Sequence, residues 1–121
     1  MAKKLLVVDD DELVVIALEE LLTPVGYDVT TAFNGFAALK KLDGSTFDLI
    51  ILDIIMPGMN GFELCEKIRA LEPHRSVPII MLTAKSSSDD RKKGLDVGAN
   101  LFLPKPIAPQ RLLDLVKSAL V

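Results

Sequence analysis

Short apolar runs alternate with amphipathic stretches along the whole chain. Apolar or alternating runs of four to six residues predict five strands, over 4–8, 27–31, 49–52, 77–82 and 99–103. Apolar residues at helical spacing predict helices after four of these runs, and the polar stretch 84–93 leads into a fifth helix that Gly94 and Gly98 keep short. Regular alternation requires crossover connections, so we expect an α/β fold: a doubly wound (βα)5 domain with one parallel sheet and helices on both faces.

Several helix starts carry their own signals. Asn34 and Asn60 are expected to cap the second and third helices, and Pro109 suits the first turn of the last helix. Ala108, just before Pro109, is a poor cap.

The run 49–52 is apolar at every position, which is typical of a strand buried on both faces. It meets a carboxylate, Asp53, and Met56, Pro57 and Gly58 then turn the chain out of the strand. Open α/β sheets bind their ligands at the carboxyl ends of the strands. Asp53 is therefore the first candidate for chemistry.

Other polar residues follow other predicted strands. Asp9 and Asp10 follow the first strand, Thr83 the fourth and Lys105 the fifth. In the flavodoxin-like strand order 2-1-3-4-5, these side chains and Asp53 converge on one crevice. Clustered carboxylates repel one another unless a cation holds them together, and oxygen ligands select a hard ion such as Mg²⁺. A nucleophilic carboxylate, a metal ion, an ammonium and a hydroxyl are the parts that phosphoryl transfer needs.

The composition fits one domain over 1–121. Half of the residues are apolar and the net charge is −3, which gives no basic footprint for direct nucleic-acid binding. No apolar run approaches the about 20 residues that a membrane span needs, so we expect no membrane contact and a cytoplasmic protein. One cysteine and one histidine argue against a disulfide and against a thiolate or imidazole metal site. Cys65 is expected to be a packing residue and His74 an exposed loop residue.

Nearly the whole sequence resembles the receiver domain of two-component response regulators, of the stand-alone chemotaxis or sporulation type. The matching segments are LLVVDDDE (5–12), DLIILDIIMPGMNGFEL (48–64), VPIIMLTA (77–84), DRKKGLDVGA (90–99) and LFLPKP (101–106).

The resemblance implies a role for each residue of the acidic crevice. Asp53 is the phosphoacceptor, which attacks a phosphohistidine of a sensor histidine kinase or phosphotransfer protein. Asp10 ligates Mg²⁺ directly, Asp9 does so mainly through water, and Asp53 and the backbone carbonyl of Ile55 complete the site; Mn²⁺ could take the place of Mg²⁺. The protein is then a stoichiometric phosphoacceptor that catalyses its own phosphorylation and dephosphorylation, and is not an enzyme acting on other substrates.

The resemblance also implies a switch. The Thr83 hydroxyl and the Ala84 amide bind the phosphoryl group, Lys105 pairs with it, and the Lys105–Pro106 peptide bond is cis. Phosphorylation pulls Thr83 inward, Phe102 follows into the space, and a downstream protein reads the surface of the fourth helix, fifth strand and fifth helix. The protein is expected to be a monomer or a phosphorylation-linked dimer.

Some positions depart from the commonest pattern of this family. Phe102 has no hydroxyl, so any switch that it makes depends on packing alone, and Pro104 removes a strand donor before Lys105. The two positions that tune hydrolysis of the acyl phosphate hold Ile55 and Lys85. Because an apolar Ile55 cannot orient the attacking water, we expect a phosphorylated state that lasts at least minutes.

Three other functions use similar parts. A phosphatase of the haloacid-dehalogenase type needs an Asp two residues after its nucleophile, where this chain has Ile55. A flavodoxin-like electron carrier needs an anion-binding loop after the first strand, where this chain has acids. A receiver that signals without phosphorylation is disfavoured by the complete set of acids, Thr83 and Lys105.

Each site residue also has a structural interpretation. The acids at 9–11 suit a solvated helix start, and Asp53, Thr83 and Lys105 would each be unremarkable alone; their joint placement at strand ends favours a site. No motif identifies the partner or the pathway, and the sequence is also compatible with a piece of a larger regulator.

Overall fold

The computed structural model of the protein describes residues 2–121 and contains the predicted strands and helices in the predicted order. The elements are β1 (Lys4–Val8), α1 (Glu12–Leu22), the 3-10 turn η1 (Thr23–Val25), β2 (Asp28–Ala32), α2 (Gly35–Leu42), β3 (Leu49–Leu52), α3 (Gly61–Ala70), the 3-10 turn η2 (Glu72–His74), β4 (Ile79–Thr83), α4 (Ser88–Asp96), β5 (Leu101–Pro104) and α5 (Pro109–Ala119). The strands β4 and β5 each begin two residues later than predicted. Pro78 has no amide hydrogen for the ladder, so β4 starts after it.

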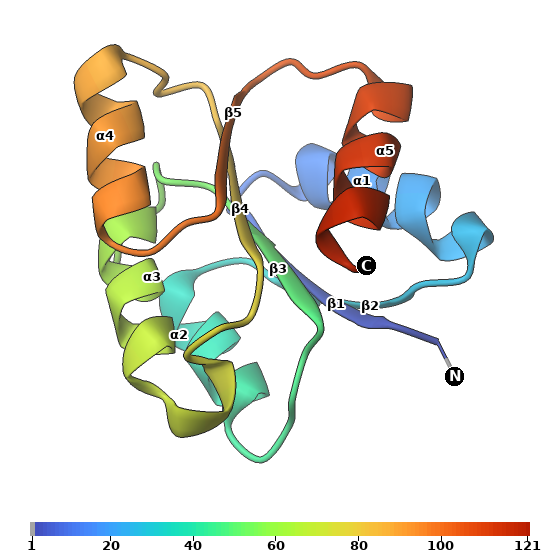
Figure 1. Ribbon diagram of the computed structural model, residues 1–121, viewed down its shortest axis with the longest axis horizontal. Helices are drawn as coiled ribbons and strands as arrows, with labels where there is room; N and C mark the ends of the chain where they lie inside the picture. Colours follow the sequence, from blue (N-terminus) through green and yellow to red (C-terminus); the bar gives the residue numbers. More distant parts are fainter. Residues whose placement is uncertain (1) are drawn as a thin grey trace.

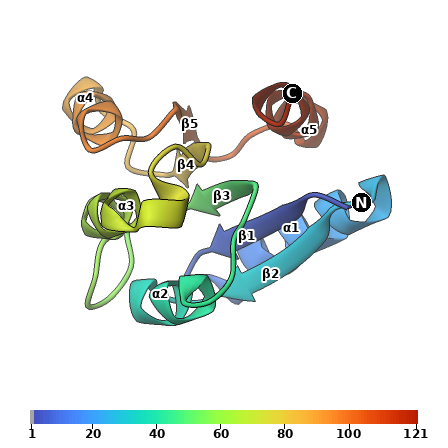
Figure 2. The same cartoon turned by 60° about the horizontal axis from the view of Figure 1, so that its bottom comes forward.

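The five strands form one parallel sheet in the order β2-β1-β3-β4-β5, which confirms the predicted topology. Helices α2, α3 and α4 cover one face of the sheet, and α1 and α5 cover the other (Figure 1 and Figure 2). The predicted doubly wound arrangement is therefore confirmed.

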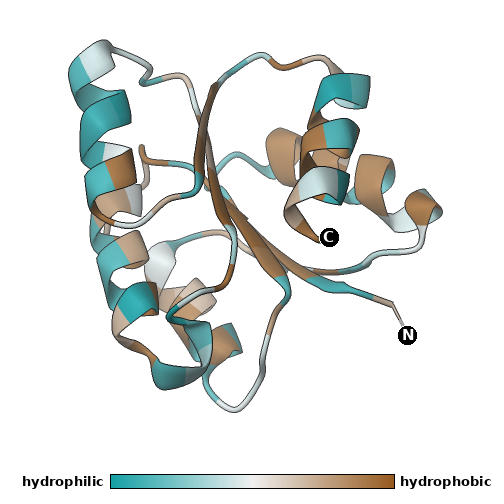
Figure 3. Ribbon diagram, in the orientation of Figure 1, coloured by the Kyte–Doolittle hydropathy of each residue, from teal (hydrophilic) through white to brown (hydrophobic). Residues whose placement is uncertain are grey.

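Each face of the sheet contributes to its own hydrophobic core. Alternate residues of β3 divide between them: Ile50 and Leu52 pack on the side of α2 and α3, and Leu49 and Ile51 on the side of α1 and α5. The central strands β3 and β4 are apolar along most of their length, whereas α4 is mostly hydrophilic (Figure 3). The continuous run 49–52 is thus buried on both faces, as its composition predicts.

Side-chain caps fix the start of two helices near the crevice. Asn60 accepts a hydrogen bond from the amide of Glu63 at 2.9 Å, and the Glu63 carboxylate accepts one from the Asn60 amide at 3.2 Å. This capping box fixes α3 directly after the loop that follows β3. Asp11 caps α1 by a single hydrogen bond that its carboxylate accepts from the amide of Leu13 at 3.0 Å, whereas Ala108 gives α5 no side-chain cap, as predicted.

The prediction that His74 is exposed is wrong, because the side chain is only 1% exposed. The turn η2 folds back after α3 and places His74 inside. The polar positions around it, Glu72 and Arg75, lie outside and form an ion pair at 3.0 Å. Within residues 2–121, no helix has both the length and the apolar character needed to cross a membrane.

Candidate functional site

Three carboxylates meet where β1 and β3 end. The register pairs Val8 with Leu52, so the residues that follow, Asp9 and Asp53, leave the sheet side by side. Asp9 and Asp53 are buried and Asp10 is exposed, and one carboxylate oxygen of each lies within 4.8 Å of the other two. The structure therefore brings together the three acids that the sequence analysis grouped.

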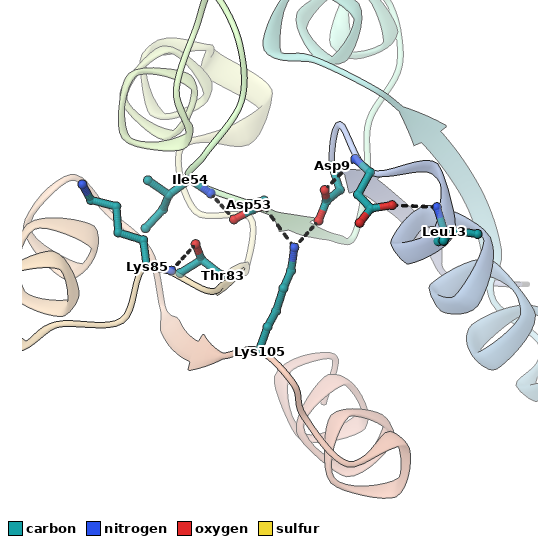
Figure 4. Close-up of polar contacts among 8 residues, drawn as sticks. Asp9, Leu13, Asp53, Ile54, Thr83, Lys85 and Lys105 are labelled. Atoms are coloured by element: carbon teal, nitrogen blue, oxygen red, sulfur yellow. Dashed lines mark hydrogen bonds and ion pairs between the residues drawn. The ribbon is translucent and has the colours of Figure 1, made fainter.

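Lys105 links two of these acids (Figure 4). Its Nζ donates to Oδ2 of Asp9 at 2.7 Å and to Oδ2 of Asp53 at 3.0 Å. Its backbone amide donates to the carbonyl of Thr83 at 2.9 Å, and the Lys105–Pro106 peptide bond is cis. The lysine thus reaches across from the end of β5 to the ends of β1 and β3.

The second oxygen of each buried carboxylate accepts a bond from a backbone amide. Asp53 Oδ1 accepts from the amide of Ile54 at 2.7 Å, and Asp9 Oδ1 accepts from the amide of Asp11 at 2.9 Å. Both carboxylates are therefore fixed through both oxygens, one on Lys105 and one on the main chain.

Burial and charge pairing act against each other in this cluster. Burial raises the pKa of Asp9, and this effect exceeds the lowering by the Lys105 ammonium. For Lys105, burial alone would lower the pKa, but hydrogen bonds to Asp9 and Asp53 raise it overall. Lys105 is therefore a permanent cation at neutral pH.

Thr83 and Ala84 lie beside the cluster at the end of β4. The Thr83 side chain is fully buried, and its Oγ1 accepts a hydrogen bond from the amide of Lys85 at 3.1 Å (Figure 4). Ala84 is exposed at the start of the loop to α4. The hydroxyl is thus held within its own loop.

Phe102 lies in the core beneath α4 and is 3% exposed. A Cβ added to Gly94 of α4 would lie 2.8 Å from the Phe102 ring and 2.9 Å from the Met81 sulfur. Only a glycine lets α4 approach this closely. Pro104 is the last residue of β5, aligned with Thr83, and the Lys105 amide makes the next bond to β4.

Gly61 also shapes the site, although its role was not predicted from the sequence. A Cβ at Gly61 would collide with the carbonyl oxygen of Asp53 and lie 2.7 Å from Cα of Ile54. The Gly61 amide donates to the Ile54 carbonyl at 2.8 Å. The start of α3 is therefore packed directly on the backbone of Asp53, and the capping residue Asn60 before it is the only sequence signal for this contact.

The donor set fits a divalent cation. Lys105 brings one positive charge against the three carboxylates of Asp9, Asp10 and Asp53. Oxygen ligands with a net negative charge are what Mg²⁺ prefers. Ile55, whose backbone carbonyl is a predicted ligand, is 55% exposed in the loop after β3.

Comparisons with known proteins all indicate the same family. A model of the response regulator receiver domain matches residues 5–117. The alkaline phosphatase synthesis transcriptional regulatory protein PhoP of Bacillus subtilis is 42% identical over 120 residues, which cover 99% of this chain and 49% of PhoP. The chain spans roughly half the length of the first curated relatives it matches.

Solved structures agree over the full chain. Chemotaxis protein CheY4 of Vibrio cholerae has a TM-score of 0.94 at 36% identity, covering 98% of this chain and 99% of CheY4. The receiver domain of sensor histidine kinase PA1611 from Pseudomonas aeruginosa has a TM-score of 0.91 at 31% identity, covering 99% of this chain and 98% of that domain. That domain is described with a magnesium ion coordinated in its active site cleft.

Proposed function

We propose that Asp53 is the residue that accepts the phosphoryl group. The chain belongs to the receiver domain family of two-component response regulators, which serves phosphorelay signalling. The observation that carries the proposal is the placement of its carboxylate. Asp53 ends β3 in the crevice, with Oδ1 on the Ile54 amide and Oδ2 at 3.0 Å from Nζ of Lys105. A buried carboxylate fixed in this way is an oriented nucleophile.

The donor is a phosphohistidine of a sensor histidine kinase or a phosphotransfer protein, and the encounter takes place in the cytoplasm, where kinases obtain ATP. An Asp53 oxygen attacks phosphorus, so that an O–P bond forms while the N–P bond to the imidazole breaks. The imidazole leaves with the bonding electron pair and takes up a proton. Lys105, the Thr83 hydroxyl and the Ala84 amide donate to the phosphoryl oxygens.

Asp9, Asp10, Asp53 and the backbone carbonyl of Ile55 would hold Mg²⁺, or Mn²⁺ in its place. The acid cluster supports this assignment, because these oxygens lie close together and carry more negative charge than Lys105 offsets. When bound, the ion offsets the charge of the carboxylates and of the incoming phosphoryl group.

The protein is a stoichiometric acceptor and not a turnover enzyme. The nucleophile is its own Asp53, which remains modified until the acyl phosphate is hydrolysed or passed on. The same residues therefore serve both its phosphorylation and its dephosphorylation.

Exposed apolar side chains near the crevice support docking of the donor protein. Leu13, the second residue of α1, is 77% exposed, Ile16 is 47% exposed, and Ile55 in the loop after β3 is 55% exposed. Single exposed apolar residues are common on protein surfaces, so what supports docking is the position of Leu13 and Ile55 in the segments that follow Asp10 and Asp53.

The output starts at Thr83. The Thr83 hydroxyl donates to the phosphoryl group, and we expect it to turn toward this group, which moves its oxygen away from the Lys85 amide and loosens the loop that leads to α4. Phe102 packs beneath α4 at Gly94, so a shift of α4 changes its packing. A downstream protein reads the surface of α4, β5 and α5, on a monomer or on a phosphorylation-linked dimer.

Intact-mass measurement after incubation with acetyl phosphate and Mg²⁺ tests the acceptor. We expect the gain of one phosphoryl group, which needs Mg²⁺ and is lost in Asp53→Ala. Asp28→Ala, at an exposed aspartate of β2, is the matched control and keeps the gain. A gain that persists in folded Asp53→Ala would contradict the proposal.

A further inference from the structure

The segment that joins Asp53 to α3 makes few hydrogen bonds of its own. Within residues 2–121, the amides of Ile55, Met56 and Gly58 donate no hydrogen bond to another protein group. The carbonyl of Ile55 accepts none from the same part of the chain. Side-chain packing therefore has to fix the position of this stretch of main chain.

Both ends of the segment are held in place. At the first end, the Ile54 amide donates to Oδ1 of Asp53 at 2.7 Å, and the Ile54 carbonyl accepts from the Gly61 amide at 2.8 Å. At the second end, Met59 is buried in the core, with 5% of its surface exposed. Ile55 lies between these two points.

The ring of Phe36, the second residue of α2, lies against the main chain of Gly58. A Cβ added to Gly58 would lie 3.0 Å from Cε2 of this ring, and its three nearest atoms all belong to the ring. Gly58 also has a φ of 82°, which residues with a side chain rarely adopt. The neighbouring contact of α2, between Gly35 and Met59, is to a flexible side chain. Phe36 thus contacts the backbone of the loop itself.

Phe36 contributes little to either hydrophobic core. It is 62% exposed and belongs to neither of the two clusters that pack on the faces of the sheet. An exposed apolar side chain is common and is no evidence of a role by itself. The contact with Gly58 distinguishes this ring, and its removal should leave the fold intact.

The chain between Gly58 and Ile55 is stiff enough to transmit this contact. The ring of Pro57 restricts its φ to about −65°. Met56 is buried in the core, with 7% of its surface exposed. Without the Phe36 ring, Gly58 regains the conformational freedom of a glycine, and the main chain at Ile55 becomes less well fixed.

We propose that Phe36 is a positioning residue of the Mg²⁺ site: its ring fixes the main chain at Gly58 and so keeps the carbonyl of Ile55 in place as a ligand. This inference rests on the proposed function, in which three carboxylates and that carbonyl hold the ion. Mg²⁺ requires nearly ideal octahedral geometry, so it tolerates little displacement of a ligand. Loss of a group that orients a metal ligand typically weakens metal binding about 10–100-fold.

The test follows Mg²⁺ binding to the full chain by NMR. Labelling isoleucine carbonyls with ¹³C and methionine amides with ¹⁵N selects Ile–Met pairs, of which the sequence has two, Ile55–Met56 and Ile80–Met81. The signal that moves in Ile55→Val belongs to the loop. Ile80 lies within β4 and serves as the internal reference. On titration with MgCl₂, we expect a saturable shift of the Ile55 signal and little change at Ile80.

Three variants separate the ring from its surroundings. Phe36→Ala should weaken Mg²⁺ binding about tenfold and should already shift the Ile55 carbonyl signal before Mg²⁺ is added. Phe36→Tyr keeps the ring at an exposed position and should bind as the native chain does. Phe33→Ala, which removes a 44% exposed ring between β2 and α2, is the matched control and should leave binding unchanged. Urea unfolding confirms that each variant is folded.

Each result decides a different point. Equal Mg²⁺ affinity in folded Phe36→Ala and in the native chain would overturn the role of Phe36 and leave the proposed function standing. Equal weakening by Phe33→Ala would show that contact with Gly58 is not the cause. No saturable shift at Ile55 in the native chain would overturn the carbonyl as a ligand. The intact-mass test then decides separately on the phosphoacceptor, because it needs Asp53 and Mg²⁺ but no signal from Ile55.

Discussion

The ammonium of Lys105 lies 3.0 Å from Oδ2 of Asp53, although 52 residues separate the two in sequence. The side chain of Asp53 is 7% exposed and that of Lys105 is 21% exposed, so the pair is screened from most solvent. The same ammonium can pair first with the Asp53 carboxylate and later with a phosphoryl group attached to that carboxylate. We therefore expect Lys105 to orient the nucleophile before transfer and to pair with the product afterwards.

Lys105→Met should slow phosphorylation of Asp53 by acetyl phosphate. Loss of one oriented donor to the transferred group costs about 10²-fold or more in rate. Intact mass against time, at one Mg²⁺ concentration, measures the effect. Lys117→Met, on α5, removes an exposed lysine and should react at the native rate. An unchanged rate in Lys105→Met would contradict a direct role.

Gly61→Ala should both destabilise the protein and slow phosphorylation. The added Cβ meets the backbone of Asp53 and Ile54, which cannot move without displacing the Asp53 carboxylate. We expect a loss of about 1–3 kcal/mol in the free energy of unfolding, as for other overpacked sites.

Gly35→Ala is the matched control, because Gly35 and Gly61 are each the first residue of a helix. At Gly35 the added Cβ meets the side chain of Met59, with its sulfur at 2.7 Å, and a flexible side chain can give way. Urea unfolding and the phosphorylation rate should change less than in Gly61→Ala. Equal effects of the two substitutions would show that backbone contact with Asp53 is not the cause.

His74 should make the protein less stable in mild acid. Burial lowers the pKa of His74 in the folded state below its ordinary value of 6.5, so the unfolded chain binds the proton more readily. Stability is then lost as pH falls below about 6.5, by at most about 1.4 kcal/mol per pH unit, until the folded-state pKa is reached. Burial is the cause of this shift, so the direction follows from the enclosure of the ring.

Urea unfolding of native protein and His74→Phe between about pH 7 and about pH 5 measures this effect. The native protein should lose more stability over this range than the variant. If the free energy of unfolding changed with pH equally in the native protein and in His74→Phe, His74 would have the same pKa in the folded and unfolded states.

The strands and the site were predictable because their signals are local. A run such as 49–52 is apolar at every position, and the regular alternation with helices leaves few topologies for the sheet. Once the strands are ordered, the polar residues that follow them share one edge. The grouping of Asp9, Asp10 and Asp53 therefore follows from the sequence without knowledge of any side-chain position.

The burial of His74 and the tight contact at Gly61 could not be predicted in this way. His74 is enclosed because η2 folds back on α3 and Arg69 holds its carbonyl, and both are contacts between separate elements. Gly61 is needed because the backbone of Asp53 lies directly against it in the fold. No pattern of neighbouring residues in the sequence predicts this contact. The inward position of Phe102 depends in the same way on the approach of α4 at Gly94.

The lifetime of the phosphorylated state should depend on Ile55. This side chain is 55% exposed two residues after Asp53 and has no polar group to orient a water molecule on the acyl phosphate. We expect phosphorylated Asp53 to persist for at least minutes after the donor is removed, as followed by intact mass. Ile55→Asn places an amide at this position and should shorten the lifetime severalfold, whereas Ile16→Asn, at another exposed isoleucine, should not. A lifetime of seconds in the purified native chain would mean that another group orients the water.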